Sequence, residues 1–392
     1  MFVRPMTIVR RRLIGIALVA LAAACHRSPD SLSLGAPEDV APGVALYRVG
    51  DESFVNHAGP IAIYLLRLDL TRVRLGTALS NGQVMDAEPV EAIAARAGAI
   101  AAVNGSFFNS GNGEPIGLLK VGGELVSDSA AEKGAVVMER GGDGATSLAF
   151  DRLAAKLSLY FTAGGKDHVV HVDGVDTTRV RGRLMLYTPA YHLDTDTAPT
   201  GTEWVLDGSP LRVVDVRMNY GHTRIPPHGA VLSFGGLDLP PDLQALVEGV
   251  PVTFETHWRS RAGLSPERLD HAADIVTGAG LLRRAGQVVA DWKDEGLSRD
   301  AFVDARHPRT LIGLDRHGVA WLAAIDGRQP SYSIGMTFAD MQRLADRLDL
   351  SDALNLDGGG STTMVVKDRV VNKPSDPIGP RPVSDAVVVL PR

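Results

Sequence analysis

The sequence has 392 residues, a formal net charge of −6 at pH 7 and one cysteine. An acidic chain without a basic patch excludes a nucleic-acid-binding protein, and a single cysteine excludes a disulfide framework. With 45% hydrophobic residues, the chain is long enough for one large domain or two fused lobes held by their own cores. No feature of the sequence indicates a protein partner.

The first 24 residues have the pattern of an export signal. Arg4 and Arg10 to Arg12 form a positively charged start, and residues 13–24 are apolar but too few to cross a membrane. Cleavage after residue 24 would remove four arginines and no acidic residue, so the formal charge of the mature chain would be −10.

Cys25 stands where a bacterial lipoprotein carries its lipidated residue. The sequence therefore predicts a membrane link through a lipid anchor at Cys25, on a periplasmic or outer-membrane protein. Ordinary cleavage after the alanine-rich segment, which would release a soluble secreted protein, stays open as the alternative. Residues 25–42 are rich in serine and proline, which indicates a flexible tether before a domain that spans residues 43–392.

Strands dominate the elements expected after the tether. Helical periodicity indicates three main helices, at residues 89–97, 241–248 and 337–348, and Thr337 with Asp340 resembles a capping box at the start of the last helix. Strand candidates lie at residues 62–68, 73–79, 99–103, 118–121, 124–126, 311–314, 319–325, 353–356 and 363–366. Because strands and helices do not alternate regularly, we predict an α+β fold with a strand-rich core of mixed or antiparallel sheet and a few flanking helices.

The most informative segment is the loop at residues 355–363, which reads NLDGGGSTT. Three consecutive glycines are retained where the backbone bends sharply or approaches a ligand closely. Bare N–H groups beside Asp357 and several hydroxyls suit an anionic or sugar-like ligand. The alternative is a tight turn that Asp357 merely caps. A P-loop is excluded, because its Gly-Lys-Ser/Thr ending is absent.

A second loop, at residues 104–109, has a similar composition. Each loop places Asn, Gly and Ser next to a short apolar strand that follows a predicted helix. We therefore expect the two loops to be neighbours in space and to form one site, with two unrelated turns as the alternative.

Together the two loops resemble the phosphodiester glycosidase family. Residues 102–108 and 355–363 carry the likeness, and weaker supporting segments occur in the expected order at residues 115–117, 175–189, 225–233, 278–280, 307–313, 333–337 and 381–385. The resemblance covers roughly residues 43–390. It implies a hydrolase that cleaves sugar-1-phosphodiester linkages, such as those of GlcNAc-1-phosphodiesters. Together with the export signal, this predicts a substrate in envelope or extracellular glycans.

Hydrolysis of such a linkage needs a carboxylate that activates water or attacks the anomeric carbon. Asp357 is the first candidate, because the adjacent glycines allow a substrate to come close. Glu114 is the second candidate catalytic residue and is expected to face Asp357, although a solvated loop glutamate is an equal alternative.

Phosphate binding needs cations and hydrogen-bond donors. Arg309 is the best phosphate ligand, since its planar fork can bind two oxygens, and Arg179 is a second cation. The alternatives are a structural salt bridge for Arg309 and a surface strand position for Arg179. Hydrogen-bonding roles towards the substrate are assigned to Asn104, Gly105, Asn355, Gly358, Gly359, Ser361 and Thr362. Asn104 and Asn355 could equally build turns.

No cofactor is required by this chemistry. A divalent cation near Asp357 would be compatible with phosphate binding, but no residue pattern demands one. Two other functions stay open: a hydrolase or transferase acting on a phosphate-free glycan, and a non-catalytic glycan-binding lipoprotein that assists exopolysaccharide export or assembly. Two free carboxylates beside an arginine favour an enzyme over a binding protein.

Overall fold

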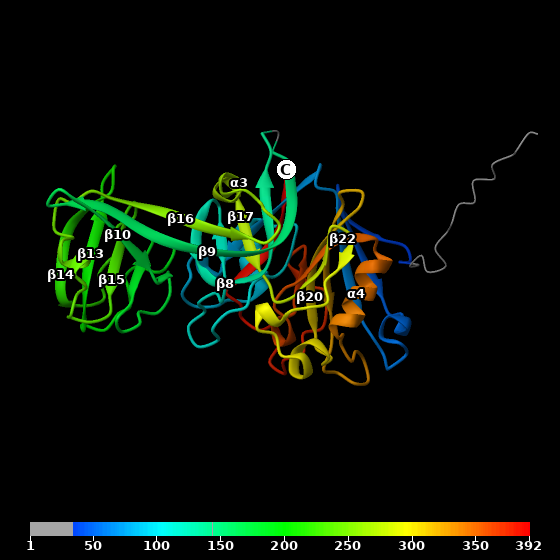
Figure 1. Ribbon diagram of the computed structural model, residues 1–392. Helices are drawn as coiled ribbons and strands as arrows, with labels where there is room; N and C mark the ends of the chain where they lie inside the picture. Colours follow the sequence, from blue (N-terminus) through cyan, green and yellow to red (C-terminus); the bar gives the residue numbers. More distant parts are fainter. Residues whose placement is uncertain (1–33, 143) are drawn as a thin grey trace, which may run out of the picture. The chain divides into compact units, whose positions relative to one another are not determined.

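Strands dominate the fold, as the computed structural model shows for residues 34–142 and 144–392 (Figure 1). Strands make up 45% of the structure and helices 13%, and all strand pairs but one are antiparallel, which confirms the predicted α+β class. The predicted export signal and Cys25 lie outside the described residues. So does the first half of the tether, residues 25–33, and the predicted end of the tether is wrong, because Glu38–Ala41 form a strand that pairs with the next one.

The largest sheet has eight strands, one of which leads into the glycine loop. Its order is β1 (Glu38–Ala41), β2 (Val44–Val49), β3 (Ile63–Leu68), β21 (Ala320–Ile325), β20 (Arg309–Asp315), β22 (Leu350–Asn355), β18 (Leu281–Arg284) and β19 (Gln287–Val288). The predicted strands at residues 311–314, 319–325 and 353–356 are thereby confirmed. Because β22 ends at Asn355, the loop that follows leaves the sheet beside β20.

A five-stranded sheet carries the other predicted loop. Its order is β24 (Arg369–Val370), β23 (Met364–Val366), β5 (Ala101–Asn104), β25 (Asp385–Pro391) and β4 (Val73–Leu79). Alternate residues of β5 face opposite sides, as the pleat of a strand requires. Val103 packs in the large core with Leu322 of the eight-stranded sheet, whereas Ala102 packs against Ile93 of helix α1 (Val90–Ala97). The loop after β5 is thus fixed between two cores.

The two remaining sheets lie within residues 119–277. The seven-stranded sheet contains β10 (Lys166–Val172), β9 (Thr146–Ala163), β8 (Ser129–Arg140), β17 (Asp274–Thr277), β6 (Leu119–Val121) and β7 (Glu124–Ser127), with β16 (Val252–Ser260) paired to β9 (Figure 1). The second five-stranded sheet has the order β11 (Gly174–Val175), β12 (Leu184–Tyr187), β15 (Ala230–Phe234), β13 (Gly201–Asp207) and β14 (Arg212–Tyr220).

The helices are few and short, as predicted. The longest is α4 (Phe338–Arg347), whose capping box is confirmed: Thr337 N–H donates to Asp340 Oδ2 (2.9 Å) and Asp340 N–H donates to Thr337 Oγ1 (3.1 Å). The helix expected at 241–248 is only α2 (Pro241–Gln244), because Leu246 N–H turns back to Leu243 and ends the helical pattern. Besides α1, α2 and α4, the described residues form one more α-helix, α3 (Pro266–His271). The remaining short helical segments are η1 (Glu52–Val55), η2 (Ser80–Gly82), η3 (Lys293–Glu295), η4 (Arg299–Val303) and η5 (Gly359–Ser361). None of the helices in the described ranges is both long and apolar enough to span a bilayer.

Candidate active site

The two predicted loops are neighbours, and Asn104 joins them. Its side-chain amide donates to the backbone oxygen of Asp357 (2.7 Å), and its Oδ1 accepts from the Thr310 hydroxyl (2.7 Å) and from Thr363 N–H (3.2 Å). In return, Asp357 N–H donates to the backbone oxygen of Gly105 (3.1 Å). The expectation that the two loops are neighbours is confirmed, but fully buried Asn104 builds the loops rather than offering free groups to a substrate.

Gly105 is needed for packing behind the site. A Cβ at this position would lie 1.9 Å from Asp385 Oδ1. The Asp385 carboxylate is fully buried and accepts hydrogen bonds from Ser106 N–H (3.0 Å), the Ser106 hydroxyl and the Ser384 hydroxyl (2.6 Å). The predicted substrate-binding role of Gly105 is therefore replaced by a structural one, since its N–H also donates to Asp385 O.

A pocket of about 270 Å³ opens beside Asp357. Gly358 and Gly359, both predicted ligand-binding positions, line it with Asp357. The other lining residues are Phe107, Ala301, Phe302, His307, Pro308, Arg309, Arg328 and Arg381. A Cβ on Gly358 would come within 2.7 Å of the Pro308 oxygen, which explains the glycine there. The pocket combines a single carboxylate with three arginines, a composition suited to an anionic ligand.

Burial sets the protonation of Asp357. Desolvation raises its pKa to about 6, and the buried Asp385 carboxylate adds to the rise. The nearby Ser361 hydroxyl, Gly358 N–H and Arg381 each favour the charged form and limit the shift. A carboxylate with this pKa is ionised at neutral pH yet basic enough to take a proton, as a general base or nucleophile must.

Arg328 is a pocket cation that the sequence analysis missed. Its guanidinium lies over Gly359, where a Cβ would be 3.0 Å from Nη2. Nη2 also donates to His307 Nδ1 (3.2 Å), while His307 Nε2 donates to Ala301 O (3.0 Å). Burial lowers the pKa of His307, so its ring stays neutral at pH 7. The Nδ1 atom of the neutral ring accepts the hydrogen bond from Arg328 and so holds the arginine in place.

Arg381 is the second missed cation. It forms a two-pronged pair with Asp376, from Nε (2.8 Å) and Nη2 (3.2 Å). A Cβ on Gly360 would lie within about 2.4 Å of both partners, so the third glycine of the loop makes room for this pair. Arg381 and His307 lie in segments that support the family resemblance, and this position in the sequence could have indicated that they belong to the site. Arg328 lay outside those segments, and only the pairing of β20 with β21 brings it to the site.

Arg309 has a structural role, which corrects its assignment as the phosphate ligand. Its side chain is 1% exposed, with Nε donating to Met336 O (3.0 Å) and Nη2 to Phe302 O and Ala305 O (2.5 and 3.1 Å). The guanidinium also lies 4.7 Å from the ring centre of Phe302. Burial lowers the pKa of Arg309 to about 10, yet the group remains cationic at neutral pH. It supports the pocket wall and contributes charge to it.

Glu114 is held away from the pocket lining. Its carboxylate accepts from the hydroxyls of Thr177 (3.0 Å), Thr178 (2.8 Å) and Tyr191 (3.4 Å), and the side chain is 6% exposed. None of these three donors lines the pocket of Asp357. The prediction that Glu114 serves as a free catalytic carboxylate is therefore wrong, because its oxygens are used to fix the loop after β11.

Arg179 belongs to a different cluster. It pairs with the buried Glu203 (3.4 Å), donates to the Ser233 hydroxyl (3.0 Å) and donates to Ala198 O. It lines another pocket, together with Asp196. Its assignment to the same phosphate site is therefore wrong.

The remaining predicted residues stand behind the loop. Asn355 is buried and its amide donates to Ala279 O (2.8 Å). Thr362 is buried against Thr310, with 3.4 Å between their hydroxyl oxygens. Ser361 is buried close to Asp357. Of the predicted polar ligands, these three thus position the loop rather than line the pocket.

Comparison with known proteins finds similarity to one family. Residues 213–390 match the family model described as phosphodiester glycosidase, and the predicted resemblance is confirmed. The match includes Asp357, Arg328 and Arg381, and it supports a glycosidase-type function.

The curated relatives are N-acetylglucosamine-1-phosphodiester alpha-N-acetylglucosaminidases. The mouse protein is 33% identical over 102 residues, which is 26% of this chain and 19% of the mouse protein; the human protein is 32% identical over 102 residues, with the same coverage. The chain therefore spans less than a fifth of the length of these relatives.

Two solved structures share the fold over most of this chain. A Synechocystis protein superposes with a TM-score of 0.73 at 22% identity, covering 90% of this chain and 63% of its own. A Burkholderia pseudomallei protein, named as exported, superposes with a TM-score of 0.71 at 25% identity, covering 85% of this chain and 74% of its own.

Proposed function

We propose that this protein is an exported glycosidase that hydrolyses sugar-1-phosphodiester linkages, of the GlcNAc-1-phosphodiester kind, in envelope or extracellular glycans. The observation that carries the proposal is the placement of Asp357 in one pocket with Arg328 and Arg381. The names of the curated relatives support the substrate class. The pocket volume of about 270 Å³ suits one sugar ring and its phosphate rather than a long oligosaccharide.

In this proposal the bond between the anomeric carbon and the phosphate oxygen breaks. The Asp357 carboxylate either attacks the anomeric carbon or takes a proton from the attacking water. The sugar gains the hydroxyl of water, and the phosphate leaves as a monoester. Arg328 and Arg381 stabilise the negative charge that the leaving phosphate gains, which is the interaction that strengthens in the transition state. Because the departing phosphate monoester is weakly basic, its oxygen does not have to be protonated by a second carboxylic acid as the bond breaks.

Replacement of Arg328 by lysine tests the substrate class. Lysine keeps the charge but loses the planar fork, so we expect kcat/KM for a GlcNAc-1-phosphodiester to fall by about tenfold. A neutral aryl N-acetylglucosaminide should be cleaved by the variant as by the wild type. Steady-state kinetics on both substrates measures the difference.

The matched control for this test is Arg316→Lys, a surface arginine that pairs with Asp349 at 3.1 Å. It should leave both substrates unaffected. An equal loss for phosphorylated and neutral substrates in the Arg328 variant would contradict a phosphodiester preference. Failure of the wild type to cleave either substrate while binding them would favour the glycan-binding lipoprotein.

The membrane link is a separate part of the proposal. The similar Burkholderia protein is named as an exported protein, which supports export of this chain. Cys25 is the residue that would carry the lipid. Cys25→Ser should abolish labelling by a radioactive or clickable fatty acid and move the protein out of the membrane fraction, because the acyl chains supply the binding energy. Unchanged fractionation would show that the lipid anchor is wrong.

A further inference from the structure

Three side chains that can bind metal meet away from the Asp357 pocket. Asp194 and Asp196 lie on the segment between β12 and β13, and His222 follows β14. A bridge between Asp194 and Arg224 and a hydrogen bond from Thr195 N–H to Thr223 O (3.0 Å) tie the two segments together. The cluster is therefore positioned by backbone pairing and not by the surface side chains alone.

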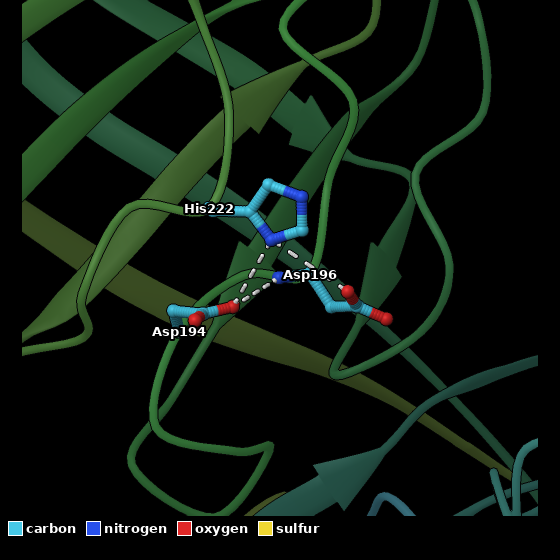
Figure 2. Close-up of side chains that lie close together, drawn as sticks. All are labelled: Asp194, Asp196 and His222. Carbon is cyan, nitrogen blue, oxygen red and sulfur yellow. Dashed lines mark hydrogen bonds and ion pairs between the residues drawn. The ribbon is translucent and has the colours of Figure 1, made fainter.

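The ring of His222 faces both carboxylates (Figure 2). His222 Nδ1 lies 3.7 Å from Asp194 Oδ1 and 3.7 Å from Asp196 Oδ1, and all ligand atoms lie within 4.8 Å of one another. Ligands about 2.1 Å from a common metal are about 3–4 Å apart, so small side-chain rotations complete the site.

In the part of the chain that the structure describes, neither carboxylate of this cluster is paired with an arginine or a lysine. Among the described residues, the ion pairs of Asp194 and Asp196 are formed with His222 alone. Fully buried Glu203 lies beneath the same loop and accepts from the hydroxyls of Thr195 (3.1 Å) and Thr197 (2.7 Å), which flank Asp196. Its Oε1 also has Arg179 at 3.4 Å, but its buried Oε2 has no hydrogen-bond partner in the described part of the chain. Through these hydrogen bonds Glu203 fixes the residues on both sides of Asp196 and so helps to position the cluster.

A pocket of about 770 Å³ adjoins the cluster, since Asp196 is one of its lining residues. Arg179, Arg181 and Asp238 line the same pocket. The volume lies in the range of pockets that hold small ligands. A cation held by Asp196 would therefore be reachable from this pocket.

We propose that Asp194, Asp196 and His222 bind a divalent first-row transition metal, with Zn²⁺ and Mn²⁺ as the best-matched ions. The imidazole nitrogen favours such metals over Mg²⁺ and Ca²⁺, which prefer oxygen ligands, and the two carboxylates suit Mn²⁺ as well as Zn²⁺. Three protein ligands leave coordination positions for water or for an oxygen-bearing ligand in the adjoining pocket. This site is independent of the glycosidase proposal.

The test uses the untagged mature chain after dialysis against EDTA. Zn²⁺ binding is measured by isothermal titration calorimetry and Mn²⁺ binding by electron paramagnetic resonance. We expect one ion per chain in the wild type, and at least about tenfold weaker binding in His222→Ala, which removes the ligand nitrogen, and in Asp196→Asn, which removes the negative charge of a ligand oxygen. Ca²⁺ should bind more weakly than Zn²⁺.

The matched controls are His228→Ala and Asp238→Asn, an exposed histidine near the cluster in sequence and an acid of the same pocket. Both should bind metal as the wild type does, and circular dichroism should show that all variants are folded. The proposal is overturned if the wild type binds neither ion, or if the His222 and Asp196 variants bind as tightly as the controls. Ca²⁺ binding as tight as that of Zn²⁺ would overturn the assignment to a transition metal.

Discussion

Asp357→Asn should lower kcat on a GlcNAc-1-phosphodiester by about 10²-fold or more, because the amide cannot act as a base or nucleophile. The substitution keeps the size of the side chain and its acceptor for Gly358 N–H (2.8 Å). Substrate binding through Arg328 and Arg381 should persist. Steady-state kinetics and substrate titration measure the two effects separately. Asp349→Asn, at an exposed acid paired with Arg316, is the matched control and should turn over normally.

The raised pKa of Asp357 gives this prediction a pH dependence. If the ionised carboxylate is the active form, kcat/KM should fall as the pH drops through about 6. The free energy of unfolding should change with pH in the opposite direction to kcat/KM. Between the unfolded pKa of 3.8 and about 6 the folded protein binds the proton more tightly, so this group destabilises the fold progressively as the pH rises through that window.

The Asp357→Asn variant should therefore unfold at the same or a higher temperature than the wild type at pH 7.5, even though its turnover is strongly reduced. Thermal unfolding at pH 4 and pH 7.5 measures this. Retained turnover would place the catalytic carboxylate elsewhere. A lower unfolding temperature at pH 7.5 would show that the ionised side chain stabilises the fold.

Gly105→Ala should give the largest loss of stability in the site region. The new Cβ would lie 1.9 Å from Asp385 Oδ1, and the carboxylate cannot retreat because it is fully buried and held by Ser106 and Ser384. Overpacking of this kind costs about 1–3 kcal/mol, and the upper end applies where the neighbour is pinned. Activity should fall as well, because Gly105 O accepts from Asp357 N–H (3.1 Å).

Thermal unfolding and kinetics together test this second prediction. Gly50→Ala is the control, because its Cβ would meet nothing closer than Ile61 O at 3.5 Å, an ordinary contact. An unfolding temperature for Gly105→Ala equal to that of the control would mean that the Asp385 cluster is far more adaptable than its hydrogen bonds indicate.

The sequence by itself determined the start of the longest helix and the two loops of the site. Thr337 and Asp340 are three residues apart and satisfy each other's backbone N–H groups, so the start of α4 was predictable from local spacing. The glycines at positions 358–360 were predictable as a site of close approach, because their conformational cost needs a reason. The structure supplies that reason in Pro308 O, Arg328 and the Arg381–Asp376 pair.

Only the tertiary structure decided which charged side chains serve the pocket. Arg309 and Arg328 are both arginines at an end of the β20–β21 hairpin, yet packing buries Arg309 against backbone oxygens and leaves Arg328 exposed at the pocket. Glu114 follows the correct loop, but the hydroxyls that bind its carboxylate come from residues 177, 178 and 191. Hydrogen-bond satisfaction of a buried charge depends on groups distant in sequence. Local spacing therefore indicates where a site forms, whereas long-range packing decides which of its charges stay free.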